Sequence, residues 1–238
     1  MQLERRQEIS RLEAFSDAAF AFALTLLVVS LEVPKSYAEL IETMRGFPSF
    51  ACCFCLLVWI WHEHNMFFRR YGLQDGLAVV LNSILLFVVL FYIYPLKFMF
   101  DSFQAQFISP SPRLIRMTFP QLANAAVIYG FGFFVLFVMF ALLYHHAYRK
   151  RHELNLSSLE VFDVKMFAGH HLVSAGIGLV AMVVALAAPV QVAFLSPMCF
   201  VLMGPAHTWF GFRAGKRRRL LEEQEKLRAS GSGAAAVF

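Results

Sequence analysis

Charge is what this sequence has little of. Aspartate, glutamate, lysine and arginine make up 16% of its 238 residues, whereas an ordinary soluble domain carries about 25%. Apolar residues account for 59%, including 27 phenylalanines. This balance excludes a typical soluble domain and predicts an all-α, polytopic membrane protein. The net charge of +5 falls in the predicted loops, so it does not indicate a nucleic-acid partner.

Cysteines and catalytic motifs are equally scarce. The four cysteines lie in apolar runs, which favours small buried side chains over disulfides or a metal site: Cys52, Cys53, Cys55 and Cys199. No Walker, Rossmann or zinc-protease motif is present, and no nucleophile–base pair stands at a useful spacing. We therefore expect no cofactor and no resident metal, and a membrane enzyme or scaffold is disfavoured.

The apolar runs predict six membrane-spanning helices, at residues 15–33, 48–68, 77–98, 122–148, 166–188 and 190–212. Pro34 ends the first of them, and Pro189 marks a tight turn between the last two. The loop after the first span could hold a short interfacial helix. Residues 1–212 would form the transmembrane domain, and residues 213–238 a basic cytoplasmic helix with a disordered tail.

Lysine and arginine predict the orientation. Most of the 21 basic residues precede the first span, lie between spans two and three or four and five, or follow the sixth. The opposite loops hold four: Lys35, Arg45, Arg113 and Arg116. The positive-inside rule then places both termini in the cytoplasm, as an even number of spans requires. The predicted location is a bacterial plasma membrane, with the basic tail near anionic lipid heads.

The first span contains polar side chains, although a simple anchor needs none. A charge near the middle of a membrane helix costs about 2.5–3.5 kcal/mol, and less near its end. Asp17, preceded by Ser16, could be an acid at the start of its own helix, or it could pair with a neighbouring span.

Thr25 lies in the middle of this span and also has two interpretations. Its hydroxyl could bond the carbonyl of Ala21, four residues earlier. Alternatively, Phe22, Thr25 and Val29 share one helical face by their spacing, and several copies of that face could line a narrow pore.

Other polar or glycine-rich motifs point to helix contacts. His62 and His64 lie about 200° apart on a helix, so they favour separate contacts over a metal site. His170 and His171 are expected near the end of the fifth span, at the membrane interface. Four glycines predict close helix contacts: Gly130, Gly132, Gly176 and Gly178.

One stretch resembles a known family. The pattern Arg-x-x-x-Phe-Ser-Asp-Ala at residues 11–18, followed by Ala23-Leu24-Thr25-Leu26-Leu27 and Pro34, is similar to the first-span signature of the transmembrane protein 175 family. Its animal members are endosomal and lysosomal potassium channels, and its bacterial members have one six-span unit. The likeness continues through Trp61, His64 and Asn82.

The resemblance implies a homotetramer in which the first helices surround the ion path. Phe22 would form the tightest hydrophobic ring, Thr25 a hydroxyl ring that contributes to selectivity, and Val29 a further apolar ring. A polar network would hold the first helix in place, made of Arg11, Ser16, Asp17, Trp61, His64 and Asn82. Phe22 departs from the family, which usually has isoleucine or leucine there. The predicted function is passive conduction by a potassium-preferring cation channel.

A second class stays open. A proton-coupled secondary transporter would show inverted repeats and broken spans, and the last two predicted spans do contain Gly176, Gly178, Pro197 and Pro205. A proton leak is the related variant, because Asp17 and His64 can titrate.

Overall fold

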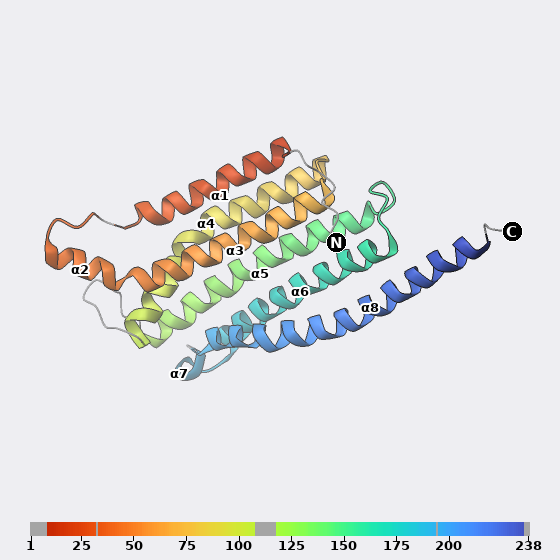
Figure 1. Cartoon of the computed structure of the whole chain (residues 1–238). Coiled ribbons are helices and arrows are strands. Elements are labelled where there is room, and N and C mark those ends of the chain that lie inside the picture. The colour runs from red at the N-terminus through yellow and green to blue at the C-terminus, as the bar shows by residue number, and fades with distance from the viewer. Residues whose placement is uncertain (1–8, 32, 108–117, 194, 236–238) are drawn as a thin grey trace.

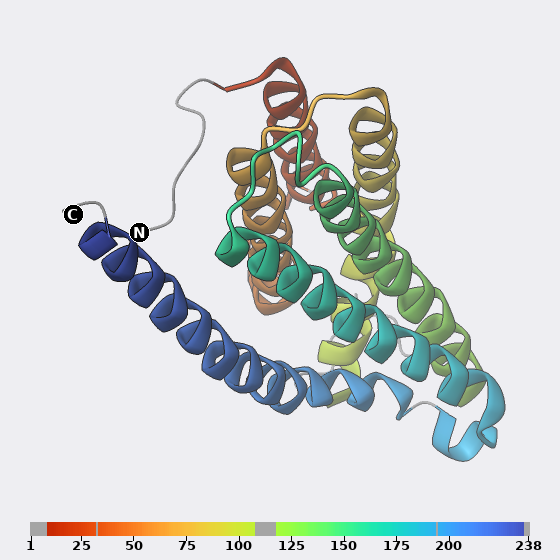
Figure 2. The same cartoon turned by 90° about the vertical axis from the view of Figure 1, so that its right-hand side faces the viewer.

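The computed structural model describes residues 9–31, 33–107, 118–193 and 195–235, and every regular element among them is helical. The long helices lie side by side in an elongated bundle (Figures 1 and 2). In chain order the elements are α1 (Arg11–Val29), α2 (Tyr37–Arg45), α3 (Phe47–Tyr71), α4 (Gly76–Phe107), α5 (Phe119–Arg149), α6 (Ser158–Ala187), α7 (Val190–Ala193), the 3-10 helix η1 (Ser196–Leu202) and α8 (Met203–Ala235).

Four helices among the described residues are long and apolar enough to cross a membrane, namely α1, α4, α5 and α6. They match the first, third, fourth and fifth predicted spans. The predicted second span coincides with α3. This helix counts as a candidate membrane span only when it is taken together with α2, and the two helices are bent by 47°. α2 is the short helix expected after the first span. The described residues thus hold four or five candidate spans.

The prediction of one continuous helix over residues 190–212 is wrong. The chain forms α7, then η1, and only from Met203 the long helix α8. Pro197 stands at the start of η1, a position where its missing N–H costs no hydrogen bond, and it disfavours a helix that continues from α7 through this point. α8 continues far beyond Phe212 to Ala235, including residues 229–235, which the sequence predicts to be unstructured.

α4 also differs from its prediction because it runs to Phe107, past Pro95. The chain after it includes Arg113 and Arg116, which lie outside the described residues. Of the four cysteines, Cys53 is buried as expected, whereas Cys52 and Cys55 are exposed, and all four are free.

α1 begins earlier than the sequence suggests because Ser10 caps it. The Ser10 hydroxyl accepts a bond from the Glu13 backbone N–H (3.2 Å), and the Glu13 carboxylate accepts one from the Ser10 N–H (2.7 Å). This reciprocal capping box satisfies two N–H groups that a helix start leaves unpaired. At the other end of α1, Lys97 Nζ of α4 donates to the Ser30 carbonyl (3.1 Å). The negative end of the helix dipole stabilises a cation at this position.

α5 and α6 approach each other through glycines. A Cβ built on Gly130 would lie 2.9 Å from the Gly178 carbonyl oxygen, and one on Gly178 would lie 3.0 Å from the Phe133 ring. The predicted close contact is confirmed at these two residues, and at Gly132, which lies against the Tyr92 ring. It is wrong for Gly176, where an added Cβ would meet open space.

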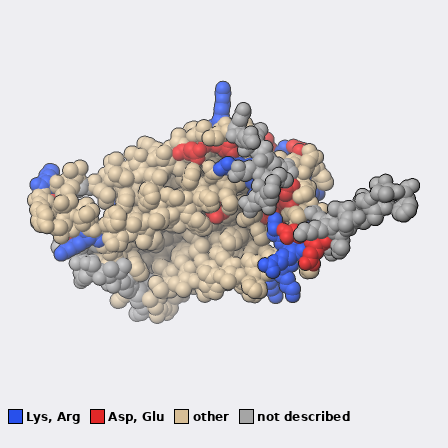
Figure 3. Space-filling model, viewed as in Figure 1, with Lys and Arg blue, Asp and Glu red and all other residues tan. Residues whose placement is uncertain are grey.

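α8 runs antiparallel to α6, back to the end of the bundle where α6 begins. Arg218 Nε of α8 pairs with Asp163 Oδ1 near the start of α6 (2.9 Å). The start of α1 and the end of α8 therefore lie at the same end of the bundle, on the right in Figure 1. In Figure 3 most charged side chains on the visible face lie toward that end, and a broad uncharged surface follows.

Candidate functional site

One face of α1 has no neighbour among the residues that the structure describes. Phe22 and Val29 are 56% and 71% exposed, and Thr25 between them is exposed as well. Phe15 extends this stripe toward the start of the helix and is 63% exposed. The Phe15, Phe22 and Val29 positions repeat every seven residues, which is the spacing of a helix seam that faces other helices.

The Thr25 hydroxyl donates a hydrogen bond within its own helix. Its Oγ1 donates to the Ala21 carbonyl at 2.9 Å, as one of the two interpretations expects. This bond does not remove the oxygen from the exposed face, since a hydroxyl oxygen keeps two lone pairs when it donates. Both interpretations of Thr25 are therefore compatible with the same side-chain position.

The opposite face of α1 is joined to α3 and α4 by buried hydrogen bonds. Asn82 Nδ2 of α4 donates to Ser16 Oγ (2.9 Å), which in turn donates to the Leu12 carbonyl (2.8 Å). Asn82 Oδ1 lies 2.7 Å from His64 Nε2 of α3. Because an amide oxygen only accepts, this bond requires the proton on Nε2 of His64. At most 1% of each of the three side chains Ser16, His64 and Asn82 is exposed.

Asp17 pairs with a neighbouring helix. The Trp61 Nε1–H of α3 donates to Asp17 Oδ1 at 2.7 Å. Trp61 is 36% exposed, so this bond lies at the edge of the buried network. Arg11, the sixth residue expected in the network, is exposed and makes no hydrogen bond to the other five within the described part of the chain. The structure thus brings together five of the six residues.

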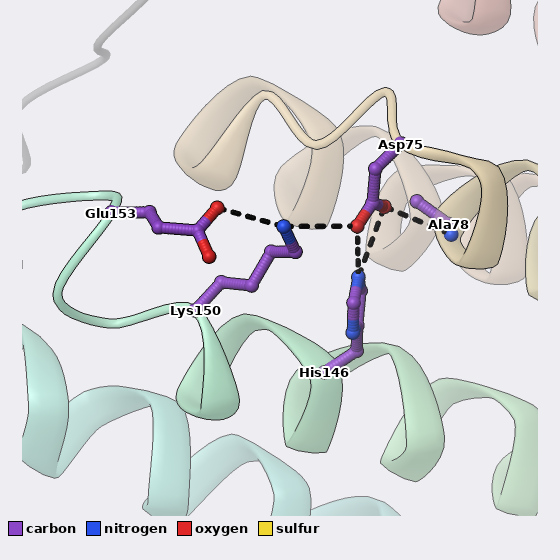
Figure 4. A network of polar contacts seen from close by, with 5 residues as sticks. All are labelled: Asp75, Ala78, His146, Lys150 and Glu153. Atoms are coloured by element: carbon purple, nitrogen blue, oxygen red, sulfur yellow. Dashed lines mark hydrogen bonds and ion pairs between the residues drawn. The ribbon is translucent and has the colours of Figure 1, made fainter.

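A second polar network, which sequence reasoning missed, ties the loop before α4 to the end of α5 (Figure 4). Asp75 accepts a hydrogen bond from His146 Nε2 (2.8 Å) and one from the Ala78 N–H (3.1 Å). Lys150 Nζ lies 3.3 Å from Asp75 and 2.7 Å from Glu153. The spacing of His146 and Lys150, four residues apart at the end of a helix, was the available signal.

Charge and hydrogen bonding set the protonation of this second network. Burial alone would raise the pKa of Asp75, but the bonds from His146 and from the Ala78 N–H outweigh it and lower that pKa below its ordinary value. The bonds with Glu153 and then Asp75 raise the pKa of Lys150. Asp75 and Lys150 are therefore charged around neutral pH. Across the residues that the structure describes, no group of three or more histidine, cysteine or acidic side chains could hold a metal ion.

Comparison with known proteins places these features in a family. Residues 11–92 match the family model described as "Endosomal/lysosomal potassium channel TMEM175". The matched part contains α1 to α3, the start of α4 and all six residues of the expected network.

Among curated proteins, a potassium channel of Marivirga tractuosa is 36% identical over 235 residues, covering 92% of this chain and 93% of its own length. A potassium channel of Chamaesiphon minutus is 25% identical over 155 residues, covering 62% of this chain and 70% of its own length.

Among solved structures, a variant of the potassium channel MtTMEM175 bound to a nanobody–MBP fusion superposes with a TM-score of 0.80 at 35% identity, covering 90% of this chain and 97% of that one. A lysosomal potassium-selective channel TMEM175 homolog from Chamaesiphon minutus superposes with a TM-score of 0.55 at 25% identity, covering 86% and 96%. The similarity extends over nearly the whole chain, and the chain belongs to the TMEM175 family of potassium channels, which are ion channels and not enzymes.

Proposed function

We propose that four copies of this chain form a potassium-preferring channel whose conduction path is lined by α1. The observation that carries the proposal is the stripe of Phe22, Thr25 and Val29, exposed on a helix whose other face is buried. In this arrangement Phe22 forms a hydrophobic constriction, Thr25 a ring of hydroxyl oxygens, and Val29 a second apolar ring. Hydrophobic constrictions gate by dewetting, and oxygens replace part of an ion's hydration shell.

The buried side of α1 supports this role. A helix that lines a pore has to keep one rotation about its axis, because a small turn would remove Thr25 from the path. The bonds that Ser16 accepts from Asn82 and Asp17 accepts from Trp61 fix that rotation from outside the exposed face. Arg11, exposed at the start of α1, would join this network only through a neighbouring subunit.

The proposed topology has six crossings, with both termini in the cytoplasm of a bacterial cell. α7, η1 and the first turns of α8 together make the sixth crossing as a broken span. Support comes from the return of α8 along α6, since it brings the basic residues after Phe212 to the end where α1 starts and α5 ends. The positive-inside rule assigns that end to the cytoplasm.

The direct test is ion flux through the purified chain in liposomes. A potassium gradient should drive a flux that does not saturate, and sodium should give less. Phe22→Ala should raise the potassium flux, because it removes the bulk at the constriction. Phe91→Ala is the matched control, since Phe91 is 70% exposed but lies on α4; its flux should equal that of the wild type.

Thr25 is tested by selectivity. Thr25→Ala should lower the ratio of potassium to sodium flux, whereas Thr25→Ser, which keeps the hydroxyl, should preserve it. Flux that saturates and follows a proton gradient would instead indicate a secondary transporter. An unchanged ratio in Thr25→Ala, or no flux in Phe22→Ala, would contradict the proposed path, and a molecular mass in detergent other than that of four chains would contradict the tetramer.

A further inference from the structure

A pair of histidines joins α6 to α8, away from the α1 site. His170 Nδ1 and His207 Nδ1 lie 3.1 Å apart, and the ring centroids are separated by 3.8 Å. Ser174 Oγ lies 2.9 Å from His207 Nε2 and 3.4 Å from the His170 carbonyl. The sequence predicts His170 near the end of its span. Because α6 begins at Ser158, His170 lies instead about three turns inside this helix.

The contact between the two histidines is a hydrogen bond that both neutral rings can make. A hydrogen bond between two ring nitrogens needs one proton between them, so one Nδ1 donates and the other accepts. With both rings neutral, His170 Nδ1 can donate to His207 Nδ1, His207 Nε2 to Ser174, and Ser174 to the His170 carbonyl. Each donor then has one acceptor, and the arrangement is complete without any added charge.

The first and second protons added to the histidine pair have different effects on the bond between the two Nδ1 atoms. The first can bind the free Nε2 of His170 and leave the bond between the two Nδ1 atoms in place. A second must bind His207 Nδ1, the acceptor of that bond. Two N–H groups and two positive charges would then face each other at 3.1 Å. The reverse tautomer gives the same result, because two fully protonated rings always carry a proton on both Nδ1 atoms.

The described surroundings of the pair hold no counter-charge for it. Within the described residues, no ion pair joins a carboxylate to His170 or His207. Glu63 of α3 faces the neighbouring His171 instead, with Oε2 3.8 Å from Nε2. From α5, the Tyr144 ring stacks on His171 at 5.2 Å. A doubly charged pair would therefore stay uncompensated between α6 and α8.

The histidine pair is one of several contacts that hold α8 on α6. Between the histidines and the Arg218–Asp163 ion pair near the start of α6, the Phe210 ring lies against Gly169, whose added Cβ would be 2.8 Å from that ring. The helix is thus held near its start by the histidines and further along by the ion pair. Loss of the histidine contact would free the start of α8 while the ion pair stays in place.

We propose that His170, His207 and Ser174 form a proton-binding site that holds α8 on α6 with up to one added proton and releases the start of α8 when a second proton binds. The inference does not rest on the proposed ion path, because protons and the α6–α8 contact can be measured without conduction.

The first measurement is a pH titration of the full chain with ¹⁵N-labelled histidines in detergent. His170 and His207 should titrate in two coupled steps more than about one pH unit apart. His170→Gln and His207→Gln are the controls, since the histidine that remains in each variant has lost its coupled partner and should titrate in one step. Independent single steps at His170 and His207 in the unmodified chain would overturn the proposal.

The second measurement is hydrogen exchange of the α8 backbone near His207 from about pH 8 down to about pH 3, corrected for the intrinsic rate. Exchange should rise with the second protonation step. His207→Gln keeps an acceptor for His170 and a donor for Ser174 but cannot be protonated, so this rise should disappear. His170→Gln should also remove the rise, and His145→Gln should leave it intact. A rise of the same size in His207→Gln would overturn the proposal.

Discussion

α1 and α5 are both candidate spans, but they are built into the bundle in opposite ways. Only 28% of the most apolar window of α1 is buried, against 50% for α5. α1 is joined to α3 and α4 by side-chain hydrogen bonds, whereas α5 approaches α6 through the backbone at Gly130 and Gly178. A peripheral helix is thus fixed by a few directional bonds, and a central one by close packing.

The difference follows from what drives helices together in a membrane. Lipid tails are as apolar as leucine, so an apolar helix gains little from leaving them, and close backbone contact or hydrogen bonds have to supply the attraction. α5 gets this attraction from small residues over a long contact. α1 leaves one face uncovered, and its polar bonds compensate for the smaller contact without using that face.

The largest effect is expected from closing the gap between α5 and α6. Gly178→Ala places a Cβ 3.0 Å from the Phe133 ring and 3.1 Å from the Gly130 carbonyl, so the helices must separate. Overpacking of this kind costs about 1–3 kcal/mol. Thermal unfolding of the purified chain in detergent should show a lower midpoint.

Gly176→Ala is the matched control for this change. It lies two residues away on the same helix, and an added Cβ would meet open space. Because alanine favours a helix over glycine, this variant should be as stable as the wild type or more stable by up to about 1 kcal/mol. Equal destabilisation by both variants would show that the glycine contact does not distinguish α5 from α1.

Breaking the bonds of α1 should have the next largest effect. Asn82→Ala removes the donor to Ser16 Oγ, which keeps only its bond to the Leu12 carbonyl, and leaves the buried His64 Nε2 unpaired. Interhelical bonds in membranes contribute on average about 0.6 kcal/mol each and at most about 1.7, so we expect a loss of about 1–2 kcal/mol. Asn124→Ala, at an exposed position on α5, should change stability little. A loss no greater than that of the control would mean that packing alone holds α1.

The sequence predicts the α1 region well because its signal is local. Ser16, Asp17 and Thr25 stand within one apolar run, and a polar atom there needs a partner, whichever helix provides it. The broken helix after Pro189 was missed because the prediction rested on mean hydropathy. An apolar run keeps a high mean hydropathy across Pro197 even where it stops being one helix.

Pairings across the bundle were missed for a different reason. The contact of His170 with His207 depends on the antiparallel register of α6 and α8, which no local pattern records. Likewise, Gly176 and Gly178 are equivalent in sequence, but they point about 200° apart on α6, and only one of them faces α5. Which residue of a helix meets which partner is decided by rotation about the helix axis.

A smaller effect is expected at the edge of the α1 network. Trp61→Phe keeps the ring against α1 but removes the donor to Asp17 Oδ1. Because Trp61 is 36% exposed, the carboxylate can find other partners, and the loss should be below about 1 kcal/mol. Trp59→Phe on the same helix removes a different indole donor, whose partner is Glu63, and so measures the cost of such a loss away from α1. If Trp61→Phe destabilised more than Asn82→Ala, the edge and not the buried centre would dominate the attachment of α1.

The smallest effect is expected where α5 itself uses polar bonds, at its end near Asp75. Because the pKa of Asp75 is lowered on folding, its stabilisation is present above the ordinary value of 3.8 and is lost as the pH falls through the lower folded value. Asp75→Asn should therefore cost up to about 1 kcal/mol at neutral pH, and the difference from the wild type should vanish in strong acid. Glu153→Gln is the control, since Glu153 is 70% exposed and its loss should be negligible. We would measure the unfolding midpoints of the wild type and of Asp75→Asn across pH. If the two midpoints diverged as the pH falls, the expected pH dependence would be contradicted, and α5 would depend on close packing alone.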